Sequence, residues 1–248
     1  MSRRSTLVAA GIAAFLVCLV AMVPASQLAS RLPDGVVMAG VGGTIWSGRA
    51  RDLAFNGRTI GAIQWSCRPW RLFQLEWSCH VTLRPAGGEL SADVQGDFGG
   101  SEIIGRDLAG QVPITAFEGL ATPRGWTGLL ELELETLRLV DRRPADAAGT
   151  LILRSLRAPG SGGQILGDFE LTIGEGAVGT GSLTGRLRDL GGPLRVRGAI
   201  ELDPDGRYLL SGEAAPGPGA GPAIFDTLAF LGPPDSQGRR PFTIEGSL

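Results

Sequence analysis

At 248 residues, 43% of them hydrophobic, the chain is long enough to form one large domain or two small ones around an apolar core. Its 39 glycines and 16 prolines exclude a helical bundle, because both residue types penalise helix interiors, and they indicate a β-rich chain with many turns. The net charge of −2 lacks the basic excess that phosphate binding requires, which excludes nucleic acid as a partner.

The chain begins with an apolar segment that follows two arginines. Arg3 and Arg4 precede the 17 residues from Leu7 to Val23, none of which carries a charge. This length reaches the lower limit of the roughly 17–25 residues that a membrane-spanning helix needs, and the arginines orient the N-terminus toward the cytoplasm. We therefore expect four parts in chain order: a cytoplasmic stub (1–6), a transmembrane anchor (7–23), a linker (24–34) and an exported β-rich domain (35–248).

The same segment also fits a cleaved signal peptide, because Val23-Pro24-Ala25 has small residues where signal peptidase reads them. Both interpretations export the rest of the chain into an oxidising compartment. Cys67 and Cys79 each end a Trp-Ser-Cys tripeptide in that exported part. We expect a disulfide between them, the alternative being two buried thiols.

Short extended segments separated by glycine-containing turns follow to the C-terminus. The clearest strand is 128–140, in which three leucines alternate with three glutamates, so that one face is buried and the other is wet. The leucines are Leu130, Leu132 and Leu134, and the glutamates are Glu131, Glu133 and Glu135. The pattern predicts a mainly β fold: a meandering antiparallel sheet of roughly a dozen strands, either curved or packed as a sandwich.

Four further elements are predicted. Asp203 to Gly206 reads as a hairpin turn, and Phe242 and Ile244 alternate with polar residues as in a terminal strand. A short helix is expected at 223–232, where Ile224, Phe225, Leu228 and Leu231 follow helical spacing. Residues 41–50, VGGTIWSGRA, predict a strand-turn-strand with Trp46 as a core anchor.

Candidate catalytic and ligand sites are weak. GEGAVG at 174–179 matches a dinucleotide-binding pattern, but a further strand rather than a helix is expected after it. The turn at Asp203 lacks the later ligands of a calcium loop. His80 would be the natural base of a hydrolase, yet no G-x-S-x-G nucleophile accompanies it, and with two cysteines it does not supply four zinc ligands. We therefore expect no enzyme activity, metal or cofactor.

The arginine-rich stretch 186–197 has arginines two residues apart, diluted by Asp189. This spacing places them on one strand face, which we interpret as a solvated face, with docking of an acidic partner as the alternative.

The five tryptophans are core anchors or interface anchors, and the sequence alone does not distinguish these two roles. They are Trp46, Trp65, Trp70, Trp77 and Trp126.

The order of these features resembles the protein N family of the bacterial type II secretion system. Its Gly-Thr-hydrophobic-Trp-x-Gly-x-Ala segment is matched after the apolar run, and its Leu-Gly-x-Pro-Asp-x-x-Gly-Arg segment is matched near the C-terminus. The first block comprises Gly43, Thr44, Ile45, Trp46, Gly48 and Ala50, and the second comprises Leu231, Gly232, Pro234, Asp235, Gly238 and Arg239. The two cysteines lie outside this pattern.

The resemblance implies a single-pass inner-membrane protein with a periplasmic domain, which acts as a non-catalytic accessory of the secretion machine. Expected partners are the inner-membrane platform proteins or the outer-membrane secretin. Two alternatives remain at the level of sequence. Long amphipathic strands can curl into a groove for the acyl chains of a lipid, and a cluster of His80 with Ser and Asp would indicate a periplasmic hydrolase.

Overall fold

The computed structural model shows a mainly β chain. The residues it describes are 11, 15, 19–29, 32, 35–74, 76–97, 99, 101–118, 124–141, 143–159, 163–174 and 182–247. Within them, 14 strands form one antiparallel sheet in the order β1-β3-β4 and so on to β14, with β2 pairing off this path with β3. The predicted antiparallel meander is confirmed, and it forms a single sheet rather than a sandwich.

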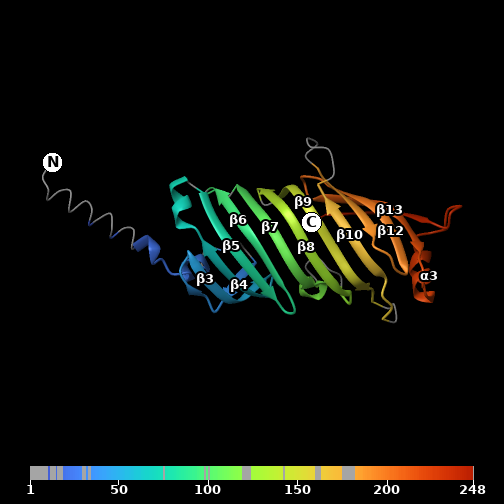
Figure 1. Cartoon of the computed structure of the whole chain (residues 1–248), viewed down its shortest axis with the longest axis horizontal. Helices are drawn as coiled ribbons and strands as arrows, with labels where there is room; N and C mark the ends of the chain where they lie inside the picture. The colour runs from blue at the N-terminus through green and yellow to red at the C-terminus, as the bar shows by residue number, and fades with distance from the viewer. Residues whose placement is uncertain are drawn as a thin grey trace.

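The strands follow one another closely along the chain. They are β1 (Val36–Ala39), β2 (Gly42–Gly43), β3 (Ser47–Phe55), β4 (Arg58–Cys67), β5 (Glu76–Pro85), β6 (Glu89–Asp97), β7 (Glu102–Pro113), β8 (Thr127–Val140), β9 (Arg143–Arg157), β10 (Gly167–Ile173), β11 (Leu183–Asp189), β12 (Leu194–Leu202), β13 (Arg207–Pro216) and β14 (Arg240–Ser247). The short helical elements are α2 (Ser26–Ala29), η1 (Pro69–Gln74), η2 (Ile114–Phe117) and α3 (Pro222–Ala229). Figure 1 shows the strands side by side in chain order along the long axis of the molecule.

The register places apolar side chains on one face of the sheet. Leu130 on β8 lies opposite Val112 on β7 and Leu153 on β9, and Leu132 lies opposite Leu151. Glu133 and Glu135 are exposed. This agrees with the predicted two-residue alternation, because successive side chains of a strand point to opposite faces. We call the two sides of the sheet the apolar face and the polar face.

Contacts between distant segments show that the sheet curls. The Arg58 guanidinium at the start of β4 donates to the carbonyl of Glu118, which follows β7 and η2. The Arg143 guanidinium at the start of β9 lies 3.4 Å from the carbonyl of Pro204, in the turn after β12. Three strand spacings amount to about 14 Å in a flat sheet. Curling therefore brings these segments together, and α3 packs on the inner, apolar face.

Two clusters of buried apolar side chains lie near the two ends of the sheet, and further buried side chains, among them Val112 and Leu134, lie between them. Ala25, Ala50 and Trp65 form the first, with Met38 and Val81 among the side chains packed against it. The second joins α3 to the sheet, with Phe242 and Trp126 among the side chains around it. Its buried members are Leu166, Phe169, Ala214, Ile224 and Leu228.

Helix α3 is shorter than predicted, and it divides its apolar residues between two sides. It ends at Ala229 rather than at 232, and Gly232, three residues later, adopts a positive φ of 94°. Such a glycine commonly terminates a helix because it has no Cβ to clash in that conformation. Ile224 and Leu228 are buried, whereas Phe225 and Leu231 are exposed. The two sides differ because residues 224 and 225 point about 100° apart on a helix.

Most of the segment predicted as stub and anchor, comprising residues 1–10, 12–14 and 16–18, lies outside the described residues. Within the described part of the chain, no helix combines the length and apolarity needed to cross a membrane. Toward the end of the apolar run, residues 19–21 are helical, and Pro24 forms an isolated antiparallel bridge with Thr44.

Candidate interaction surfaces at the two ends of the sheet

The first motif block forms a tight turn between β2 and β3. The Thr44 amide donates to the Ser47 carbonyl at 2.9 Å, and the Ser47 amide donates to Thr44 Oγ1 at 3.1 Å. Gly43 has a φ of 90°, and a Cβ at this position would collide with the Ser47 carbonyl. Gly43 and Thr44 therefore determine the turn, because Gly43 adopts the left-handed backbone conformation and Thr44 supplies the side-chain hydrogen-bond acceptor.

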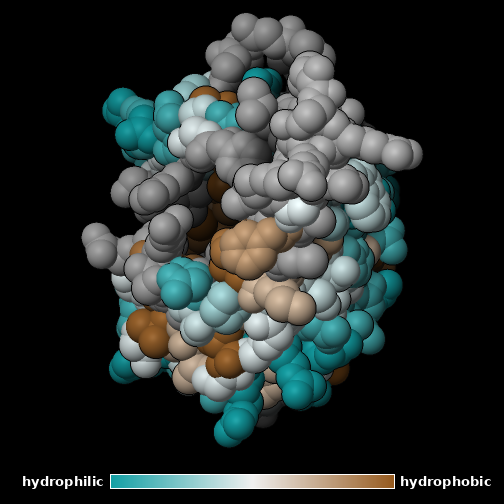
Figure 2. Space-filling model, turned by 90° about the vertical axis from the view of Figure 1, so that its left-hand side faces the viewer, coloured by the Kyte–Doolittle hydropathy of each residue, from teal (hydrophilic) through white to brown (hydrophobic). Residues whose placement is uncertain are grey.

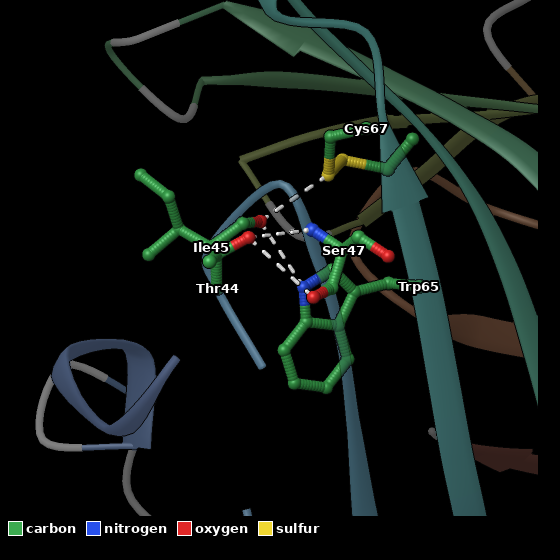
Figure 3. The surroundings of a disulfide bond; sticks show 6 residues. Thr44, Ile45, Ser47, Trp65 and Cys67 are labelled. Atoms are coloured by element: carbon green, nitrogen blue, oxygen red, sulfur yellow. Dashed lines mark hydrogen bonds between the residues drawn. A yellow bond between two sulfur atoms is a disulfide. The ribbon is translucent and has the colours of Figure 1, made fainter. Parts of the chain in front are cut away.

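This turn is tied to the disulfide-bearing hairpin of β4 and β5. Cys67 and Cys79 face each other in the register and are joined by a disulfide with an S–S distance of 2.02 Å. Figure 3 shows the Trp65 indole beside the turn, where its Nε1 donates to the Ile45 carbonyl at 3.1 Å. The Cys67 amide donates to the Trp46 carbonyl at 2.6 Å. The turn, Trp65 and the disulfide thus form one connected unit.

The tryptophan of the block plays a different part from the one predicted. Trp65 is buried, with 6% of its surface exposed, whereas Trp46 is only half-buried. Trp46 Nε1 instead donates to the carbonyl of Val20 at 2.9 Å, and the Ile45 amide donates to the carbonyl of Val23 at 3.0 Å. The interpretation of Trp46 as a core anchor was wrong, because the register places the Trp65 ring over Gly48 and fills that space. Trp46 connects the sheet to the end of the N-terminal apolar run.

The second motif block forms a clasp between α3 and β14. Asp235 Oδ1 accepts hydrogen bonds from the amides of Gln237 at 2.8 Å and Arg239 at 2.9 Å. The Asp235 amide donates to the Arg239 carbonyl at 2.7 Å, and Gly238 has a φ of 77°. The Arg239 guanidinium contacts Asp235 at 3.1 Å and also reaches Glu213 on β13 at 2.7 Å. The clasp therefore fixes the loop that leads into the last strand.

The hydrogen bonds of the clasp shift the pKa values of both charged partners. The Arg239 amide, acting with the Gln237 amide and the Arg239 charge, lowers the pKa of Asp235 below its usual value of 3.8. The hydrogen bond to Glu213 is the largest cause of the raised pKa of Arg239, and the charges of Asp235 and Glu213 add to it. Both groups lie at the surface, so these shifts mark hydrogen bonding rather than burial.

Three large apolar side chains that precede the clasp in the chain are exposed. Phe230 is 91% exposed, Phe225 is 50% exposed and Leu231 is 37% exposed, while Ile224 and Leu228 on the other side of α3 are 1% exposed. We call Phe225, Phe230 and Leu231 the α3 patch. Beside the clasp lies a cavity of about 730 Å³, whose charged lining residues are Asp189, Arg195, Arg197, Glu213 and Arg239. The sequence pattern did not reveal this patch, because helical spacing alone does not tell which side of α3 faces the sheet.

The other candidate sites do not form catalytic or ligand-binding arrangements in the described residues. His80 Nδ1 lies 2.9 Å from Asp93 Oδ1 on the polar face, with the two side chains 57% and 40% exposed. Ser66 is the register neighbour of His80 on β4, but no hydrogen bond joins these two side chains among the described contacts. His80 and Asp93 therefore lie at the surface, without the cleft that usually surrounds a general base in an active site.

Two predicted turns have different outcomes. The Asp203 amide donates to the Arg207 carbonyl at 2.8 Å, and the hairpin of β12 and β13 is confirmed. In the glycine-rich 174–179 segment, residues 175–179 lie outside the described residues. The next element along the chain is strand β11, which pairs antiparallel with β10.

Within the described part of the chain, no group of three or more His, Cys, Asp or Glu residues has metal-binding geometry.

The arginines of 186–197 lie on the polar face as predicted. Arg186, Arg188, Arg195 and Arg197 are all exposed. Arg188 pairs across the strands with Glu170 at 2.6 Å. The solvated-face interpretation agrees with this exposure.

Comparison with known proteins gives a single family. The model of type II secretion system protein N matches residues 34–243. The chain is 28% identical to the type II secretion system protein N of Aeromonas hydrophila over 258 residues, covering all of both chains. It is 25% identical over 239 residues to the protein of the same name from Vibrio cholerae serotype O1 (strain ATCC 39315 / El Tor Inaba N16961), covering 88% of this chain and 87% of the relative. No solved structure matches. The chain thus belongs to the type II secretion system protein N family.

Proposed function

We propose that this chain is a non-catalytic accessory of the type II secretion system, held in the inner membrane by residues 7–23 with its β-rich domain in the periplasm. There it supports the export of folded periplasmic proteins across the outer membrane. Its family membership and the arginine-flanked apolar run support this proposal. Its partners are other components of the machine, either the inner-membrane platform proteins or the outer-membrane secretin.

The α3 patch is the observation that carries the interaction role. Large aromatic side chains rarely remain fully exposed in a group, and such groups mark surfaces that bind other proteins. The clasp holds the patch in place, because the Arg240 guanidinium donates to the Gly232 carbonyl at 2.8 Å and Arg239 joins the same loop to β13. The cavity beside the clasp is lined by charged residues, and a polar rim is common in protein interfaces.

The N-terminal contacts support the anchored arrangement. The Trp46 indole and the Ile45 amide hold the backbone of Val20 and Val23, and the Ala25 amide donates to the Gly43 carbonyl at 3.1 Å. Ala25 itself is buried in the first cluster. If the apolar run spans the membrane, the first motif block lies against the bilayer surface, where tryptophan is favoured.

Export measurements test this proposal. In a secreting host that lacks the gene, the chain should restore the export of folded periplasmic substrates, and the double variant Phe225→Ser/Phe230→Ser should restore less. The matched control is Trp70→Ser, which removes an aromatic side chain that is 64% exposed on η1, away from the patch. Equal export by the double variant and the control, at equal protein levels, would refute the role of the patch. Unchanged export on deletion of the gene would refute the secretion role.

Cell fractionation tests the anchor. The chain should sediment with inner membranes and its N-terminal sequence should begin at or next to Met1. Recovery of soluble protein that starts at Ser26 would show instead that the apolar run is a cleaved signal peptide.

A further inference from the structure

The apolar face continues without a polar break across the middle of the sheet. From β5 to β10, the register aligns rows of aliphatic side chains, such as Leu132, Leu151 and Leu171. The other members include Leu83, Leu90, Val94, Ile103, Leu108, Leu130, Leu137, Leu139, Leu153 and Ile173. The charged side chains of these described strands, such as Glu133 and Glu170, alternate onto the polar face.

Most side chains of this middle region are half-buried, whereas Val112, Leu134 and Ala147 within it are buried. The leucines of its rows other than Leu134 are intermediate in exposure, whereas Trp65 and Phe169 are buried in the two clusters. Among the described helices, α3 packs on β13 and on Phe169 of β10, η1 contacts β5, and η2 contacts β8.

The shape of the face is that of a groove. Contacts between segments from distant strands curl the sheet, and Figure 2, which views the molecule along its long axis, shows hydrophobic atoms recessed in a hollow behind the atoms at the front. Small residues on the inside permit the curl. Gly96 lies beneath the Trp77 ring and Gly246 beneath Tyr208, and a Cβ at either position would collide with the ring. The groove is therefore walled by the apolar face, with one buried cluster near each of its ends.

We propose that this groove binds the acyl chains of a phospholipid. A peptide backbone would leave its N–H and C=O groups without partners against rows of leucine, which is costly, whereas an acyl chain has no such groups. A second copy of the sheet presents a concave surface that does not complement another concave surface. Five strand spacings from β5 to β10 give about 24 Å, enough for the roughly 15 Å that one leaflet of acyl chains occupies.

The position of the groove agrees with a lipid ligand. The cluster near its first end contains Ala25, next to the apolar N-terminal run, so in the anchored arrangement proposed above the groove starts beside the bilayer. This step rests on the proposed function, whereas the shape and chemistry of the groove do not.

Photocrosslinking in cells tests the proposal on the full-length chain. A photoreactive phenylalanine analogue replaces Leu132 on the apolar face or, as the matched control, its neighbour Glu133 on the polar face. Cells grown with radioactive palmitate are irradiated, and the purified chain is examined for radioactive acyl label. We expect radioactive acyl label when the analogue is at position 132 and none when it is at position 133. A second site at Leu151, directly opposite Leu132 on β9, should also take label.

Three results would overturn the groove: no label at 132 and 151, equal label at 132 and 133, or a protein-sized adduct at 132 in place of lipid. The outcomes also separate the two proposals. A chain that restores export but takes no label refutes the groove and leaves the secretion role standing. Label at 132 and 151 in a chain whose deletion leaves export unchanged supports the groove and refutes the secretion role.

Discussion

Replacement of Gly48 by alanine tests whether the first motif block is built around the Trp65 ring. A Cβ at this position would collide with the ring carbon Cζ2 of Trp65 and would lie 2.8 Å from the Thr44 carbonyl oxygen. The backbone of Gly48 does not have a positive φ, so alanine is compatible with its conformation and the effect arises from crowding. Trp65 must therefore move from a buried site in which it donates to the Ile45 carbonyl.

The expected loss of stability follows from these contacts. Overpacking of a filled site costs about 1–3 kcal/mol, and loss of the Trp65 hydrogen bond costs about 1 kcal/mol more. With an m value near 3 kcal/mol/M in urea, a total of about 3 kcal/mol lowers the unfolding midpoint by about 1 M.

Urea denaturation of the purified chain, followed by circular dichroism, measures this shift. The matched control is Gly42→Ala in the same segment, where a Cβ would have no neighbour within 4 Å. The control should change stability by no more than about 0.5 kcal/mol. Equal midpoints for Gly48→Ala and Gly42→Ala would refute the packing of Trp65 on Gly48.

Two further predictions concern the disulfide and the clasp. Thiol labelling of the folded, unreduced chain should modify neither Cys67 nor Cys79, and labelling of both without reductant would contradict the bridge. The double variant Cys67→Ser/Cys79→Ser should lose about 3 kcal/mol of unfolding free energy, as expected for a loop closed over 12 residues. Because the folded-state pKa of Asp235 is lowered, its contribution to stability is present above its ordinary value of 3.8 and is lost as pH falls through the lower value. Asp235→Asn should therefore unfold more easily at pH 7 and lose less stability on acidification to pH 3, and an unchanged pH dependence of urea unfolding would refute this.

The sequence by itself determined the local architecture. Alternation such as that of Leu130 to Glu135, punctuated by glycine turns, predicted an antiparallel meander with one wet face, because side-chain direction in a strand has a period of two residues. The Asp203 hairpin and the existence of a helix near Phe225 also followed from local patterns. The motif blocks identified the family before any contact was known.

Only the tertiary structure decided which residues meet. Trp65 rather than Trp46 is buried because the register of β3 and β4 sets Gly48 opposite Trp65, and register depends on pairing between strands. The exposure of Phe225 and Phe230 depends on which side of α3 meets the second cluster. The curl of the sheet depends on contacts as distant as Arg143 and Pro204. The periodicity of a sequence indicates which face of its own strand a side chain points to. The curvature of the sheet and the burial of each face depend instead on contacts among many strands, and a local sequence pattern carries no information on those contacts.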